Sequence, residues 1–182
     1  MGKIILSVLL FAVLAMSISK NIYAQEKQAG SSAMPSQRTE IKEDRRAKIL
    51  KAYLLSKNSP LATSSETFVK NADKYNLDWK LLVAISAVES TYGQQIPNNS
   101  YNAWGWGIYG DHMILFTSWN EGIETISKGL REKYMDTWGA KDVYQIGRLY
   151  AASPTWATRV DRFMQKIDEF ATKDPSSLSI SL

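Results

Sequence analysis

Apolar positions recur at helical spacing along most of the chain, and alternating strand-like patterns are almost absent. Ser153-Pro154 marks the start of the last helix, with Pro at its first position. The pattern therefore predicts an all-α fold of five or six helices. Besides the central segment described next, the predicted helices are 40–56, 65–75, 118–134, 142–151 and the stretch that begins at 153.

The segment 77–93, LDWKLLVAISAVESTYG, is the most apolar of these patterns. Leu81 to Val88 is apolar nearly all round, which is typical of a helix that is buried on every side. Asp78 is expected to cap its start and Gly93 to end it. We expect this helix at the centre of the fold, with the others packed around it.

The stretch 94–117 is rich in aromatic residues, Gly and Asn, which predicts a loop with a small hairpin near Gly110-Asp111. The next helix opens with Ser118-Trp-Asn-Glu121, which has the spacing of a capping box. Glu121 is therefore interpreted as a capping residue.

The N-terminus has the pattern of an export signal. Lys3 precedes an apolar run from 4 to 18, shorter than the roughly 20 residues of a bilayer span. We predict a signal peptide over 1–24, cleaved after Ala24, which places the mature chain in the periplasm or outside the cell. The alternative is an uncleaved membrane anchor carrying an interaction protein. The remaining parts are a flexible linker at 25–39, the folded domain at 40–173 and a tail at 174–182.

Composition narrows the possible chemistry. The 182 residues include no Cys and one His, His112, which excludes disulfides, thiolate metal sites and His-rich zinc sites. His112 is interpreted as a loop residue, and we expect no metal and no cofactor. The formal net charge of +4 gives little support for a nucleic-acid partner. We expect the chain to act as a monomer.

Glu89 is the residue that does not fit its apolar surroundings. A buried setting and the negative end of a helix dipole both disfavour a charged carboxyl, so the side chain is expected to keep its proton. A general acid requires this property. Two alternatives remain at this point: an ordinary surface Glu, or a Glu paired with Arg148 or Arg159.

Aromatic residues and glycines alternate in SYNAWGWGIYG, residues 100–110. Glycine lets the backbone approach a ligand closely, and aromatic faces with a polar rim suit sugar rings. Core filling is the alternative for each aromatic residue here, and Trp79 and Trp138 are assigned to the core. The candidate substrate-binding residues are Ser90, Tyr92, Asn102, Trp104, Trp106 and Tyr109.

Four short motifs, in order over residues 60–170, resemble the lysozyme-like superfamily of peptidoglycan-cleaving enzymes. ESTYG at 89–93 resembles the ES-x-[FWY]-G stretch of its glucosaminidase family, glycoside hydrolase family 73, and the shorter ES motif of lytic transglycosylases. NAWGWG at 102–107, SWNEGI at 118–123 and YAASPTWATRV at 150–160 resemble later segments of the glucosaminidase family. The transglycosylase G-L-M-Q segment is absent, which favours the glucosaminidase branch.

The resemblance implies a lysozyme-like helical domain with a small aromatic lobe, which cleaves the β-1,4-linked strand of N-acetylglucosamine and N-acetylmuramic acid. It implies that Glu89 is the catalytic acid and that Tyr150 lies beside it in the cleft. It also implies a second carboxylate, for which Asp111 is the candidate; a hairpin-turn Asp is the alternative.

The sequence leaves the outcome of cleavage open. Water activated by Asp111, or by the acetamido group of the substrate, would complete hydrolysis. Attack by the sugar's own 6-hydroxyl would instead give anhydro ends, as in a lytic transglycosylase. A non-catalytic glycan-binding or scaffold domain of the same fold also fits the pattern, and the choice between the two glycosidic bonds is not determined.

Overall fold

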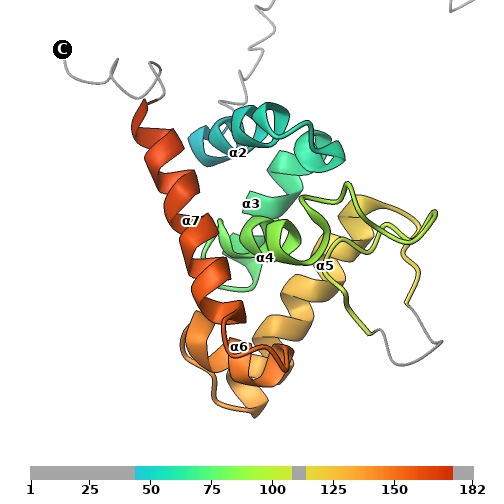
Figure 1. The fold of residues 1–182 in the computed structure, drawn as a ribbon, viewed down its shortest axis with the longest axis vertical. Helices are drawn as coiled ribbons and strands as arrows, with labels where there is room; N and C mark the ends of the chain where they lie inside the picture. The colour runs from blue at the N-terminus through green and yellow to red at the C-terminus, as the bar shows by residue number, and fades with distance from the viewer. Residues whose placement is uncertain (1–43, 108–113, 174–182) are drawn as a thin grey trace, which may run out of the picture. The chain divides into compact units, whose positions relative to one another are not determined.

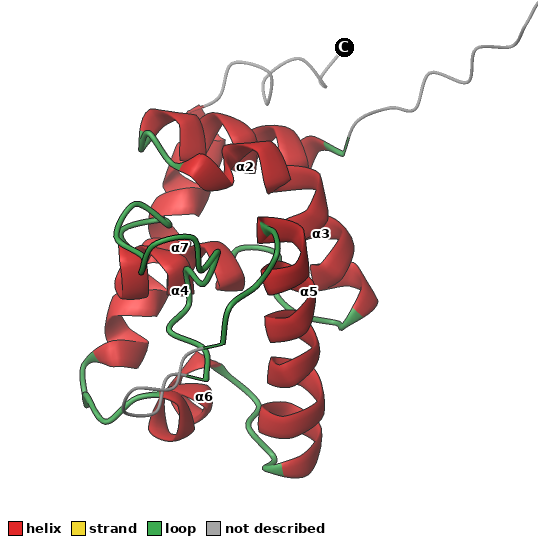
Figure 2. Cartoon of the chain, turned by 90° about the vertical axis from the view of Figure 1, so that its right-hand side faces the viewer, coloured by secondary structure: helices red, strands yellow, loops and turns green. Residues whose placement is uncertain are grey.

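Six α-helices make up most of the computed structural model, which describes residues 44–107 and 114–173 (Figure 1). No strand occurs within these two ranges (Figure 2), and the predicted all-α class is confirmed. The described elements all belong to one unit, residues 42–182. The helices are α2 (Arg45–Ser56), α3 (Ser65–Lys74), α4 (Leu81–Ser90), α5 (Trp119–Gly129), α6 (Val143–Tyr150) and α7 (Trp156–Lys173).

Two short helical stretches of other types complete the described chain. A 3₁₀ helix, η1 (Pro60–Ser64), leads into α3, and a π-helical stretch, η2 (Leu130–Thr137), continues α5. Within the described ranges, no helix is long and apolar enough to pass through a bilayer. The predicted signal, linker, tail and hairpin, with Tyr109, Asp111 and His112, lie outside the described residues.

Helix α4 is the centre of the fold, as its sequence predicts. All residues from Leu81 to Ala87 are buried, and the helix packs between α7 and α5 (Figures 1 and 2). Apolar side chains on every face of α4 therefore contribute to the core, at about 1.5–3 kcal/mol for each large one that is fully buried. The position of α4 fixes where its C-terminal residues meet the loops.

Both ends of α4 differ from the prediction. The carboxylate of Asp78 accepts a hydrogen bond from the backbone N–H of Lys80 (2.9 Å), so it caps a turn before the helix rather than the helix itself. The helix stops at Ser90 because Thr91 adopts the left-handed conformation, with φ of 53°, two residues before Gly93. Glu89 consequently stands in the last turn.

One half of the predicted capping box is present at the start of α5, whereas the Glu121 carboxylate bonds Thr117, one residue before the N-cap Ser118. The Ser118 hydroxyl accepts a hydrogen bond from the Glu121 backbone N–H (3.2 Å). The Glu121 carboxylate accepts from the backbone N–H and the hydroxyl of Thr117, each at 2.6 Å. These hydrogen bonds hold the pKa of Glu121 below its usual value, so this carboxylate serves the helix start.

Candidate active site

Glu89 is held at the end of α4 by contacts from two distant parts of the chain. The indole N–H of Trp156, at the start of α7, donates a hydrogen bond to Glu89 Oε1 at 2.5 Å. On the other side, Glu89 Oε2 lies 3.1 Å from the point where a Cβ would stand at Gly105. Gly105 also has a φ of +62°, a conformation that favours glycine, and a Cβ at this position would be in tight contact with the carboxylate.

The surroundings of Glu89 correct one expectation from the sequence. The side chain is exposed, although Leu81 to Ala87 and Ser90 in the same helix are buried. The predicted apolar enclosure is therefore wrong, because Glu89 faces away from the core in the last turn of α4, beside Gly105, while Ser90 in the same turn is buried. The carboxyl group is both fixed by Trp156 and open to a ligand.

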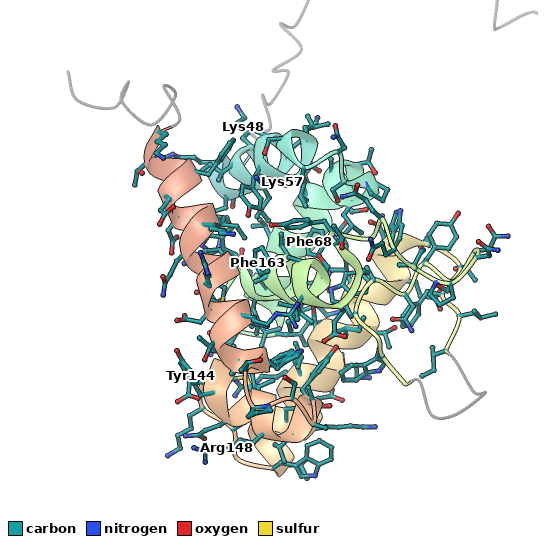
Figure 3. All side chains as sticks on the ribbon, viewed as in Figure 1. Lys48, Lys57, Phe68, Tyr144, Arg148 and Phe163 are labelled. Carbon is teal, nitrogen blue, oxygen red and sulfur yellow. The ribbon has the colours of Figure 1, made fainter. Side chains whose placement is uncertain are left out.

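No cation neutralises Glu89 within the described part of the chain. Neither Arg148 nor Arg159 forms an ion pair with it, and both are exposed. Arg148 lies on α6, at the lower end of the molecule in Figure 3 and away from α4. The pairing alternative is thus not observed.

In the same ranges, no three carboxylate or imidazole side chains come together as a metal site.

Tyr150 supports the carboxyl through Trp156. Its ring stacks on the Trp156 ring, with centroids 4.7 Å apart and planes at 22°. Its hydroxyl donates to the Trp104 carbonyl oxygen at 2.6 Å. Burial, the negative charge of Glu89 and the neighbouring Tyr134 raise the pKa of Tyr150 well above its ordinary value, so the hydroxyl stays a neutral donor.

A pocket of about 270 Å³ is lined in part by Gly105, the residue beside the Glu89 carboxylate. Three aromatic rings in its wall, Trp106, Tyr134 and Tyr150, lie 5.8–5.9 Å apart between centroids. Flat faces and a polar margin are features that bind sugar rings. The described residues that line the pocket are Gly105, Trp106, Gly107, Ile114, Lys133, Tyr134, Trp138 and Tyr150.

The π-helical stretch η2 provides one wall of this pocket. It carries Lys133 and Tyr134 and is capped by Trp138, and all three side chains reach the lining. Gly129, just before η2, allows the Trp106 ring to lie against the helix, because a Cβ at that position would overlap the ring. π-Helical turns are frequent at functional sites. The helical periodicity of the sequence does not distinguish this π-helical stretch from an α-helix.

Asn102 shapes the loop rather than facing the pocket. Its side chain is buried, and its amide nitrogen donates to the carbonyl oxygens of Trp106 (2.8 Å) and Ile114 (3.0 Å). Its amide oxygen accepts from the backbone N–H of Trp106 at 3.0 Å. Asn102 thus joins the two arms of the loop that carry Trp106 and Ile114, and it is not among the described residues that line the pocket.

Trp104 belongs to the core. It has no exposed surface, and its indole N–H donates to the Leu82 carbonyl oxygen at 2.9 Å. The ring contacts Phe68 of α3 edge-on. Of the two interpretations left open by the sequence, core filling therefore describes Trp104, whereas its neighbour Trp106 lines the pocket.

Ser90 and Tyr92 are also buried instead of lining the pocket. The Ser90 hydroxyl donates to the Ala103 carbonyl oxygen (2.7 Å) and accepts from the Gly93 backbone N–H (2.9 Å). This joins the end of α4 to the aromatic loop. The Tyr92 hydroxyl is hydrogen-bonded to that of Tyr53 in α2 at 2.9 Å, and burial raises the pKa of Tyr92.

Two Trp residues have roles that sequence reasoning missed. Trp138, assigned to the core, is 53% exposed and lines the pocket, whereas Trp79 packs partly buried against the core as expected. Trp156 lies in the stretch that the sequence predicts as the last helix, and the hydrogen bond from its indole to Glu89 is not part of that prediction. The sequence feature that could have identified Trp156 is its place six positions after Tyr150, in the segment YAASPTWATRV that resembles a late segment of the glucosaminidase family.

No family model matches the chain. It is similar to two proteins named "Putative endo-beta-N-acetylglucosaminidase", from Streptococcus pneumoniae serotype 4 (strain TIGR4) and strain R6. Each is 28% identical over 120 residues, which is 62% of this chain. The match covers 18% and 17% of those proteins, so the chain spans less than a fifth of their length.

Two solved structures of S. aureus autolysin E have a similar fold. A catalytic mutant in complex with the disaccharide NAG-NAM gives a TM-score of 0.56 at 18% identity. The complex with the muropeptide NAM-L-Ala-D-iGlu gives 0.58 at 20% identity. Each match covers 68% of this chain and 66% of the other. The likeness shows that this chain shares the helical fold of autolysin E over the matched part.

Proposed function

We propose that this chain cleaves the β-1,4-linked glycan strand of peptidoglycan as a glucosaminidase, with Glu89 as the general acid. The observation that carries the proposal is a carboxyl group that is fixed by Trp156, is open to solvent and has no ion-pair partner among the described residues. It lies beside Gly105, which lines an aromatic pocket. The names of the streptococcal relatives and the glycan ligands of autolysin E support the same substrate class.

In the proposed reaction, Glu89 donates its proton to the glycosidic oxygen while the bond from that oxygen to the anomeric carbon breaks. Positive charge then develops on the sugar ring as an oxocarbenium-like species. The oxygen of a water molecule then bonds to the anomeric carbon, the group that activates the water takes its proton, and Glu89 regains a proton from solvent before the next turnover. The Trp156 indole keeps the carboxyl oriented during both steps, since its donor reaches only Oε1 and leaves Oε2 toward the loop.

The second step requires a group that activates the water. Asp111 is the candidate carboxylate in the chain, and the acetamido group of the substrate is the alternative. An inverting hydrolysis through Asp111 requires its carboxyl to lie about 6.5–9.5 Å from that of Glu89. Attack by the 6-hydroxyl of the sugar requires no second carboxylate.

We also propose that the chain works outside the cytoplasm, as a monomer, after export by the segment 1–24. The support is the charged start and the short apolar run of that segment. The proposed substrate, peptidoglycan, is a cell-wall polymer outside the cytoplasm, and this location of the substrate agrees with export.

Digestion of purified peptidoglycan by the full mature chain tests the proposal. We expect soluble fragments whose new ends are reducing N-acetylglucosamine, identified by borohydride reduction and mass spectrometry. Anhydro ends would instead show that the chain carries out the lytic transglycosylase reaction and not hydrolysis. Absence of any release, together with co-sedimentation of the chain with the polymer, would contradict cleavage and favour a glycan-binding domain.

A further inference from the structure

Lys133 gives the aromatic pocket a positive charge. Among the eight residues that line the pocket, it is the one with a charged side chain, and the others are aromatic, aliphatic or glycine. It extends from η2, next to Tyr134, and is exposed to solvent. An aromatic pocket alone is suited to a neutral sugar, so a cation in its wall implies a second recognition element.

The other charged side chains near Lys133 on the same helical segment already have partners. Arg131 pairs with Asp136 at 2.9 Å, and Lys128 lies 3.9 Å from Glu132. The Lys133 ammonium, by contrast, forms no ion pair or hydrogen bond with any residue in 44–107 or 114–173. Its charge is thus available to a ligand in the pocket.

The proposed substrate contains one kind of unit that can use this charge. N-acetylglucosamine is neutral, whereas N-acetylmuramic acid carries a lactyl group that ends in a carboxylate. When a stem peptide is attached, the lactyl carboxyl becomes an amide and the peptide supplies carboxylates of its own. A carboxylate and an ammonium group form a charge-assisted hydrogen bond, which is stronger than a neutral one.

We propose that Lys133 is a specificity-determining residue that selects a carboxylate-bearing sugar unit for the aromatic pocket. This inference rests on the proposed function, because it assumes that the pocket holds the glycan strand. Trp106, Tyr134 and Tyr150 would bind the sugar faces of any strand, and Lys133 would distinguish acidic from neutral strands. Since Lys133 is exposed, the preference weakens as ionic strength rises.

Binding measurements on a Glu89→Gln background, which prevents turnover, test the assignment. The ligands are peptide-free glycan strands, strands with stem peptides, and chitin oligomers of the same length, which have no carboxylate. At low salt, we expect Lys133→Met to weaken binding of an acidic strand by about three- to tenfold and to leave chitin binding unchanged. Lys133→Arg should retain the preference, and Lys141→Met, an exposed lysine outside the pocket lining, should alter neither affinity.

Each result decides a defined point. Weaker binding of peptide-free strands identifies the lactyl carboxylate as the ligand, and weaker binding only of peptide-bearing strands identifies a peptide carboxylate. Equal loss for chitin and acidic strands, or no loss for either acidic strand, overturns the role of Lys133 while glycan binding itself stands. If no strand binds to the background protein, the proposed function fails and the inference fails with it.

Discussion

Replacing Glu89 by Gln is expected to lower glycan cleavage by about 10²–10⁴-fold, the usual contribution of a positioned general acid. The amide has nearly the same shape, and its oxygen can still accept the hydrogen bond from the Trp156 indole. It has no acidic proton to donate to the glycosidic oxygen. The fold and the affinity for glycan should therefore remain, while kcat falls and KM changes little.

The measurement is the rate of release of reducing ends from a soluble glycan strand, with thermal unfolding as a check on the fold. Glu169→Gln is a matched control, because Glu169 is an exposed glutamate on α7 that does not line the pocket. It should have the activity of the unmodified chain. Equal rates for the Glu89 and Glu169 variants would refute the role of Glu89 as the acid.

Trp104→Ala should lower the free energy of unfolding by about 3–5 kcal/mol, the cost of truncating a large buried aromatic side chain. The Trp104 ring is fully buried, and its loss would also remove the hydrogen bond that the indole donates to the Leu82 carbonyl oxygen. Chemical denaturation monitored by far-ultraviolet circular dichroism gives this value.

Trp138→Ala provides the matched comparison, since it removes the same side chain from a position that is 53% exposed. We expect a loss of less than about 1 kcal/mol in stability and weaker binding of glycan, because the ring lines the pocket. If Trp138→Ala were the more destabilising variant, or Trp104→Ala left stability unchanged, the assignment of the two rings to pocket and core would be incorrect.

Local patterns in the sequence were sufficient to predict the helices and the central element. The run from Leu81 to Val88, which is apolar except for Ser86, predicted a buried helix, and residues 81–87 are buried. The Ser118–Glu121 spacing predicted the start of α5. These features depend on neighbours within one or two helical turns, which is the range that periodicity and capping describe.

The site itself depends on contacts that local patterns do not contain. Glu89 and Trp156 are 67 positions apart, and nothing near either residue predicts that they meet. Trp104 and Trp106 stand in the same aromatic, Gly-rich context, yet Asn102 turns the loop so that one ring enters the core and the other lines the pocket. The exposure of Glu89 likewise follows from where α4 ends, which the left-handed Thr91 determines.

The most direct test of the central claim is a crystal structure of the Glu89→Gln variant with a bound peptidoglycan strand that spans the scissile bond. We predict that the amide at position 89 lies within about 2.6–3.2 Å of the glycosidic oxygen, with sugar rings against the aromatic pocket. A strand bound elsewhere, or with every glycosidic oxygen beyond the reach of this side chain, would contradict the account.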